Sequence, residues 1–320
     1  MTGAAGTLSR AVGIDVGGTK TAAALVSGDG SVLALETLPT PADDVDATLA
    51  TIVKAARAVI APDVRAVGIA AAGLVGWKTG ELVFAPNLAW RQVPLAAYLT
   101  SLLGVPVVAD NDNTAAAWGE YVFGAGRGFE DLLLVGVGTG IGGGIVTGGR
   151  LFHGAHGFAA EIGHIVMDPD GPLCGCGNRG CWEQFASGQA VTRAGRAAVR
   201  GGAVTVLADL TTGDPDRVTG PMVTQAARGG DAVSVDILRD AGHWLGVGIG
   251  GLVNILDPEI VVMAGGVAEA GDLLLEPARS AYRETVEAAE LRPDVPIVMA
   301  AHGNNTGVVG AAALVLEAPG

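Results

Sequence analysis

Short apolar runs separated by turn residues open the chain. The runs over 12–16, 21–26 and 32–38 are joined by glycine-containing turns, which predicts a meander of three antiparallel strands. Apolar residues then recur at helical spacing over 46–60, and a continuous apolar run over 66–72 is typical of a buried strand. The N-terminal part is therefore expected to form a sheet whose strands are interrupted by a helix.

The same pattern starts again near the middle of the chain. After a strand over 105–109 and a helix from about Thr114, another strand is expected over 132–137. A glycine loop over 138–144 then leads into a short strand, 145–147, and a Gly-Gly turn. We interpret the two halves as copies of one plan, each opening with a strand, a glycine-rich hairpin and a second strand.

Strands and helices alternate in the last part of the chain. A strand over 259–264, a helix over 272–289, a strand over 295–301 and a helix over 306–316 follow one another. This alternation predicts an α/β fold with largely parallel sheets. Because no low-complexity linker separates the halves, the chain is expected to cross between two domains at tight hinges near Asp112 and Asn304.

Composition narrows the class of partner. Of the 320 residues, 49% are hydrophobic, enough to bury one large core or two medium ones. The net charge of −14 argues against a nucleic-acid partner, because phosphate backbones are bound by clustered Lys and Arg. Neither a signal peptide nor a membrane span is apparent, so we expect a cytoplasmic protein without a membrane partner.

All three cysteines fall within eight positions, as Cys174, Cys176 and Cys181. An extracellular disulfide framework would spread an even number along the chain. With His164 ten residues upstream, the cluster offers four ligands that suit tetrahedral zinc with no open position. The sequence therefore predicts a structural zinc site, with free thiols as the alternative.

The first glycine loop runs from Asp15 to Lys20, between the first two strands. Gly17 and Gly18 would let backbone N–H groups approach phosphate oxygens, and Thr19 and Lys20 could add side-chain donors. Asp15 could hold a hydrated magnesium ion. A plain β-turn is the alternative, and the Walker pattern is not matched.

The second glycine loop begins at Gly138 and formally contains G-x-G-x-x-G. A dinucleotide-binding fold would need a helix directly after it, whereas here the continuation reads as a strand and a turn. A phosphate-binding hairpin is therefore favoured over a nicotinamide-dependent oxidoreductase.

Asn111 and Asp112 stand where a strand ends and a helix begins. Helix N–H groups near Asp112 would favour its ionised form, and an ionised carboxylate can accept a proton from an attacking hydroxyl. Helix capping, which Asn and Asp commonly perform, is the alternative.

Taken in order, these motifs resemble the ROK family of bacterial sugar kinases and sugar-responsive repressors, within the actin, hexokinase and Hsp70 superfamily. The resemblance covers nearly the whole chain. The segments that carry it are Asp15 to Lys20, Asn111-Asp112, the loop at Gly138, Glu161 to His164, Cys174 to Glu183 and Ala264 to Val267.

This resemblance implies two actin-like, ribonuclease H-like α/β domains with mixed sheets flanking a cleft, plus a small zinc-bearing loop. The smaller domain would comprise residues 1–112 and 304–320, and the larger one residues 113–303. The family is often dimeric or tetrameric, so a homodimer or homotetramer is expected.

The resemblance also assigns roles to residues. Asp112 would be the general base, and a zinc-bound His164 would turn its second nitrogen towards the sugar. Ala160 stands where the family usually has glycine, a departure expected to be tolerated. Asn87 and Gly73 could instead be turn residues. The implied sugar ligands are Gly73, Asn87, Asn111, Asp112, Glu161, His164 and Glu183; the implied ATP contacts are Asp15, Gly17, Gly18, Thr19, Lys20, Gly138, Thr139, Gly140, Gly142, Gly265 and Gly266; and the implied zinc ligands are His164, Cys174, Cys176 and Cys181.

The expected reaction is transfer of the ATP γ-phosphoryl group to the 6-hydroxyl of glucose, with Mg²⁺ bridging phosphates. N-acetylglucosamine, N-acetylmannosamine or fructose as acceptor, and polyphosphate as donor, are alternatives within this class. A DNA-binding repressor is disfavoured because only 11 residues precede Val12. A sugar-binding regulator without a DNA-binding domain stays open.

Overall fold

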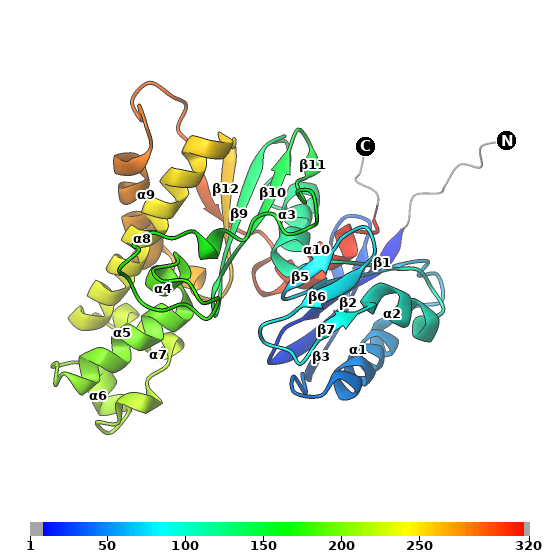
Figure 1. The fold of residues 1–320 in the computed structure, drawn as a ribbon, viewed down its shortest axis with the longest axis horizontal. Helices are drawn as coiled ribbons and strands as arrows, with labels where there is room; N and C mark the ends of the chain where they lie inside the picture. The colour runs from blue at the N-terminus through cyan, green and yellow to red at the C-terminus, as the bar shows by residue number, and fades with distance from the viewer. Residues whose placement is uncertain (1–8, 317–320) are drawn as a thin grey trace. The chain divides into compact units, whose positions relative to one another are not determined.

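The computed structural model describes residues 9–316 (Figure 1). Its first sheet has the strand order β3-β2-β1-β4-β8. Its first three strands form the expected antiparallel meander, whereas β1, β4 and β8 run parallel. The sheet is therefore mixed, as the family resemblance implies, and not largely parallel, as the alternation of strands and helices predicts. The strands are β1 (Arg10–Val16), β2 (Lys20–Ser27), β3 (Val32–Pro39), β4 (Val67–Ala71) and β8 (Val107–Asn111).

Helices cover both faces of this sheet. Alternate residues of β1, such as Val12 and Ile14, join a core shared with α1 (Val45–Val59) and α2 (Leu95–Leu103). The opposite face packs on α10 (Thr306–Ala313), which in turn contacts α3 (Asp112–Phe123). A small antiparallel sheet of β5 (Leu74–Gly76), β6 (Glu81–Phe84) and β7 (Arg91–Val93) follows β4.

Glycines let α10 approach the sheet closely. A Cβ on Gly68 of β4 would lie 1.7 Å from the carbonyl oxygen of Ala311, and one on Gly13 of β1 would lie 1.9 Å from that of Val308. No larger side chain fits at either position without moving the helix.

The second sheet repeats the plan of the first, with the order β11-β10-β9-β12-β13. In both sheets a run of three consecutive strands is followed by two strands on the far side of the first. The predicted duplication is therefore confirmed at the level of strand order. The strands are β9 (Leu132–Val137), β10 (Ile141–Thr147), β11 (Arg150–Leu151), β12 (Ile260–Ala264) and β13 (Ile297–Met299).

Most of the remaining helices come between β11 and β13 in the sequence. The longest, α8 (Ala232–Leu256), packs along α9 (Asp272–Thr285), where Gly246 meets the backbone of Ala278. The shorter helices are α4 (Glu183–Ala186), α5 (Gly188–Arg200), α6 (Val206–Leu210) and α7 (Gly220–Arg228), and the 3₁₀ turns are η1 (Ile162–His164), η2 (Pro215–Arg217), η3 (Ala268–Ala270) and η4 (Gly303–Asn305).

Several predicted boundaries shift by a few residues. The glycine loop expected over 138–144 is shorter, because β10 already begins at Ile141. Gly144 of this strand serves packing, because a Cβ there would lie 2.4 Å from the carbonyl oxygen of Asn113. Helix α9 ends at Thr285 because Val286 adopts an extended conformation.

Contacts divide the chain into two compact units. The first unit contains the described residues up to Leu134, Gly144–Ala160 and those from Ala300 onward; the second contains Val135–Gly143 and Glu161–Met299. Helix α3 falls in the first unit because it packs on α10, whereas the expected domain boundary lay before it. The expected domains, 1–112 with 304–320 and 113–303, stay a prediction. Their ends at 1–8 and 317–320 lie outside the described residues.

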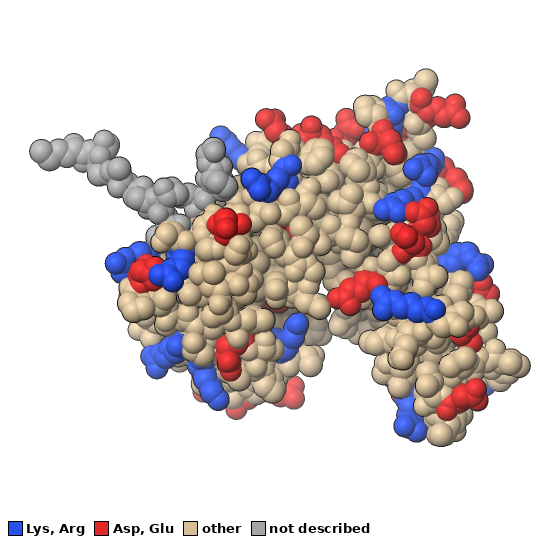
Figure 2. All heavy atoms as spheres, turned by 180° about the vertical axis from the view of Figure 1, so that it is seen from behind, with Lys and Arg blue, Asp and Glu red and all other residues tan. Residues whose placement is uncertain are grey.

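The surface carries charged side chains of both signs. On the face shown in Figure 2, Lys and Arg side chains lie scattered among Asp and Glu. Between residues 9 and 316, none of the helices combines the length and the apolar character that a bilayer crossing requires.

Candidate active site and metal centre

Asn111 and Asp112 mark the junction of β8 and α3 in the first unit. Asn111 is the helix N-cap: its Oδ1 accepts from the backbone N–H groups of Asn113 at 2.9 Å and Thr114 at 3.0 Å. Its Nδ2 donates to the carbonyl oxygen of Gly73 at 3.0 Å. The capping alternative therefore applies to Asn111, and the second N–H of its amide is what it can offer a ligand.

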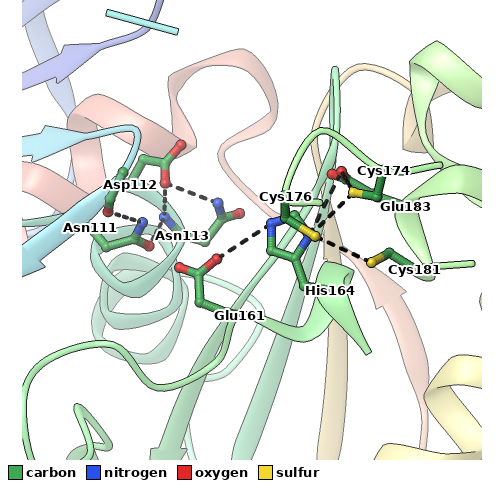
Figure 3. A network of polar contacts seen from close by, with 10 residues as sticks. Asn111, Asp112, Asn113, Glu161, His164, Cys174, Cys176, Cys181 and Glu183 are labelled. Carbon is green, nitrogen blue, oxygen red and sulfur yellow. Dashed lines mark hydrogen bonds and ion pairs between the residues drawn. The ribbon is translucent and has the colours of Figure 1, made fainter. Parts of the chain in front are cut away.

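Asp112 is the first residue of α3 and is partly buried. Its Oδ1 accepts from the backbone N–H of Asn113 at 2.9 Å and from Asn113 Nδ2 at 3.0 Å (Figure 3). Burial raises the pKa of Asp112 above its ordinary value, and the bonds from Asn113 oppose that rise. The carboxylate is thus held in one orientation while being made a stronger base.

Asp15 lies near Asp112 at the end of β1. The pKa of Asp15 is raised to about 6, mainly by burial, with the negative charge of Asp112 adding to the rise and Lys20 opposing it. The carboxylate also lies against α10, since a Cβ on Gly307 would be 2.5 Å from Asp15 Oδ2. Two acidic groups that repel one another suit a position where a cation binds between negative charges.

Four further predicted residues lie around this end of the sheet: Gly73, Gly18, Asn87 and Lys20. Gly73 has φ +142°, and a Cβ there would lie 2.3 Å from the carbonyl oxygen of Phe84, so only glycine fits. A Cβ on Gly18 would lie 2.9 Å from both Cβ and the carbonyl oxygen of Asn87, so the first glycine loop rests against the segment that carries Asn87. Lys20 is the first residue of β2 and is exposed.

The four predicted zinc ligands come together in the second unit. One ligand atom each from His164, Cys174, Cys176 and Cys181 lies within 4.8 Å of the others. Cys176 Sγ and Cys181 Sγ are 3.6 Å apart, and Cys174 Sγ is 3.7 Å from His164 Nδ1 (Figure 3). Ligands about 2.3 Å from a tetrahedral zinc ion are separated by about 3.8 Å, so the spacing fits this metal.

The surroundings of Cys174 favour its protonated thiol form. Burial raises the pKa of the Cys174 thiol to about 12. The Glu183 carboxylate contributes to that rise, because its Oε1 lies 3.1 Å from Cys174 Sγ. A sulfur in this setting becomes a thiolate only when a cation compensates the charge.

His164 faces two ways. Its Nδ1 is directed towards Cys174, whereas its Nε2 lies 4.0 Å from Glu161 Oε2. The residue can therefore bind a metal through one nitrogen and present the other beside a carboxylate. Glu183 Oε1 lies 3.9 Å from His164 Nδ1, so Glu183 belongs to the surroundings of the cysteines.

The nucleotide candidates of the second unit also meet. Gly265 has φ +90° and its Cβ would lie 2.5 Å from the carbonyl oxygen of Val137, directly before Gly138. The carbonyl oxygen of Gly138 accepts from Gly188 N–H at 2.8 Å, and a Cβ on Gly140 would lie 2.4 Å from Glu183 Oε2. Gly142 lies within β10 and so belongs to the strand.

Sequence reasoning missed two buried acidic residues of the first unit. Glu120 is fully buried and accepts from the N–H groups of Ala125, Ala301 and His302. Asp110 is 4% exposed and pairs with His153. Their positions on an inward face of a helix and of a strand are the signal that could have found them, because a buried carboxylate requires partners.

A model of the ROK family matches residues 11–318. The chain belongs to this family. The resemblance inferred from the motifs is thus confirmed, and with it the actin-like α/β fold.

Relatives within the ROK family include enzymes and repressors. A glucokinase of Streptomyces coelicolor is 43% identical over 311 residues, which are 96% of this chain and 97% of that protein. The structure of a ROK family glucokinase from Streptomyces griseus, in complex with glucose and AMPPNP, has a TM-score of 0.88 at 41% identity, covering 95% of this chain and 98% of that one. The xylose repressor of Bacillus subtilis is 30% identical over 78% of this chain and 61% of its own length.

Proposed function

We propose that this chain is an ATP-dependent glucokinase, which transfers the γ-phosphoryl group to the 6-hydroxyl of glucose. Its similarity to glucokinases over nearly the whole length supports the reaction class. The observation that carries the mechanism is Asp112, a fixed carboxylate of raised pKa at the start of α3.

Asp112 is proposed as the general base. Its Oδ1 is held by Asn113, and Oδ2 can accept the proton of the sugar hydroxyl as that oxygen attacks phosphorus. A raised pKa brings the base closer to the working pH, and the positive end of α3 keeps a fraction ionised.

Sugar and nucleotide are proposed to use the residues named from the sequence. Gly73, Asn87, Asn111, Glu161, His164 and Glu183 would bind the sugar, and the loops at Gly17 and Gly138 with Gly265-Gly266 would approach ATP. Asp15 would hold Mg²⁺, which neutralises charge developing on the phosphates. Because ATP is the donor, we propose that the enzyme acts in the cytoplasm. From the family resemblance, we also propose that it forms a homodimer or homotetramer.

The cysteine cluster is proposed to bind structural zinc. Four protein ligands leave no open coordination position, so the ion would orient His164 and the loop from Cys174 to Glu183 without taking part in the chemistry.

An ADP-release assay with ATP and Mg²⁺ tests the proposal. Glucose, mannose, fructose, N-acetylglucosamine and N-acetylmannosamine are supplied in turn, and strong preference for glucose is expected. Preference for another sugar would keep the mechanism but change the substrate. Two negative results together would overturn the kinase: no sugar-dependent ADP release with ATP, and no sugar phosphate formed with polyphosphate. They would favour a sugar-binding regulator, a role that the xylose repressor similarity makes worth testing.

A further inference from the structure

Next to Asn111 in the sequence, Asp110 makes a buried contact with His153 that none of the proposed catalytic roles uses. His153 Nε2 is 2.7 Å from Asp110 Oδ2, and the two side chains are 13% and 5% exposed. The imidazole stacks on the indole of Trp77, with ring centroids 4.6 Å apart and planes inclined by 12°. The histidine is therefore fixed both in its plane and by its hydrogen bond.

Both oxygens of Asp110 are engaged. Oδ2 meets His153, and Oδ1 accepts from the backbone N–H of Asn111 at 2.8 Å. Because a carboxylate accepts from both directions, Nε2 of the histidine acts as the donor. The orientation of Asp110 is thus set by a residue 43 positions away in sequence.

From Asp110 the hydrogen bonds continue into the proposed catalytic residues. Asn111 bonds to Gly73 through Nδ2 and to the first N–H groups of α3 through Oδ1. Asp112 follows directly in sequence. A shift of Asp110 would move the backbone of Asn111, and with it the start of α3 that carries the base.

We infer that His153 and Asp110 are positioning residues for Asn111 and Asp112, with Trp77 fixing the imidazole. This inference rests on the proposed function and adds the support of its catalytic groups. Without His153 as donor, Asp110 Oδ2 would be buried with an unmet hydrogen bond, which is costly and would favour a different orientation of the carboxylate. Misplacing a reacting group by about 1 Å can cost up to about 100-fold in rate.

The test compares steady-state kinetics of the full-length protein and variants at 25 °C. In His153→Phe the ring can still stack on Trp77, but the donor to Asp110 is lost. We expect kcat to fall by about tenfold or more and KM for glucose to rise, while KM for ATP stays within about twofold. His153→Gln, whose amide can donate to Asp110, should recover most of the loss. His243→Phe, on an exposed histidine of α8, is the matched control and should behave as wild type.

A structural anchor alone would give a different result. It would lower the melting temperature with unchanged kcat and sugar KM, or would weaken sugar and ATP binding equally, and either outcome overturns the inference. If His153→Phe fails to fold, Asp110→Asn and His153→Gln carry the test with the same split of parameters expected for Asp110→Asn. Failure of the proposed function is recognised separately, since the wild-type protein would then show no sugar-dependent ADP release.

Discussion

At the scale of single residues, Asp112 and Asp15 combine burial with mutual repulsion. Burial raises the pKa of both groups, and Asp112 adds to the rise at Asp15. Strongly shifted pKa values of this kind are typical of catalytic and ligand-binding residues.

Replacing Asp112 by Asn tests the base directly. The amide keeps the hydrogen-bond geometry but cannot accept a proton, so turnover should fall by at least about 1,000-fold, with glucose affinity within about tenfold of wild type. Turnover comes from the ADP-release assay and affinity from calorimetry. Near-native turnover would remove Asp112 from this role.

Asp15 should make stability depend on pH. Its pKa is raised from 3.8 to about 6 in the folded protein, so its favourable contribution is complete below about pH 3.8 and is lost as pH rises through 6. Without Mg²⁺ and nucleotide, Asp15→Asn should therefore stabilise the protein at pH 7.5, by at most about 3 kcal/mol, and much less at pH 4.5. Urea unfolding at both pH values measures this, and an equal effect at both would contradict the origin in ionisation.

Ala160 adopts φ +66°, a conformation that costs a side-chain-bearing residue about 1 kcal/mol. Glycine at this position would avoid that cost. Ala160→Gly should thus stabilise the protein by about 0.5 kcal/mol, whereas Ala159→Gly, at a position without positive φ, should destabilise it by about 0.5–1 kcal/mol. Chemical unfolding of both variants decides; losses of equal size would show that strain at Ala160 is negligible.

Residues with a local signature could be predicted from sequence. Glycine loops and clustered cysteines reveal their chemistry through their neighbours, and the structure brings the four zinc candidates together. The pairing of Asp110 with His153 could not be predicted, because only the tertiary fold brings these positions together.

At the scale of elements, close packing decides what the glycines do. The predicted meander and most strands appear where apolar runs indicated them, but β10 begins four residues earlier than expected. Its glycines looked like a loop because sequence alone does not show that a helix backbone lies against the strand.

Substitution of Gly68 tests how tightly α10 packs on the first sheet. A Cβ at this position would lie 1.7 Å from the carbonyl oxygen of Ala311, so Gly68→Ala must displace the helix and should cost about 2–4 kcal/mol. Gly251→Ala in α8 is the control: nothing lies within 4 Å of its Cβ, and it should be neutral or stabilising. Thermal unfolding of both variants is the measurement, and similar melting temperatures would contradict the packing.

In the loop from Cys174 to Glu183, loss of the metal and loss of sugar binding should occur together. Trp182 anchors it, since its Nε1 donates to the carbonyl oxygen of Trp244 at 2.7 Å and its ring packs on Gly248. Cys176→Ser should reduce bound zinc, measured by atomic absorption, and weaken sugar binding together. Unchanged glucose affinity in zinc-free protein would contradict the orienting role of the metal.

At the scale of the whole molecule, the same strand order occurs twice. The sequence showed the repeat through two strand–glycine–strand patterns, although the residues of the two halves differ. It could not show where the compact units divide, because the membership of α3 depends on its contact with α10, nearly 200 residues later in the chain.

The position of α10 has a consequence for biosynthesis. This helix covers β1 and β4 and contacts α3, yet the ribosome makes it after the entire second unit. The first sheet thus emerges early with this face uncovered, although α1 and α2 can already pack on its other face. The face towards α10 closes only near the end of translation. The two faces of one sheet therefore gain their helices at opposite ends of translation, α1 and α2 before the second unit is made and α10 after it.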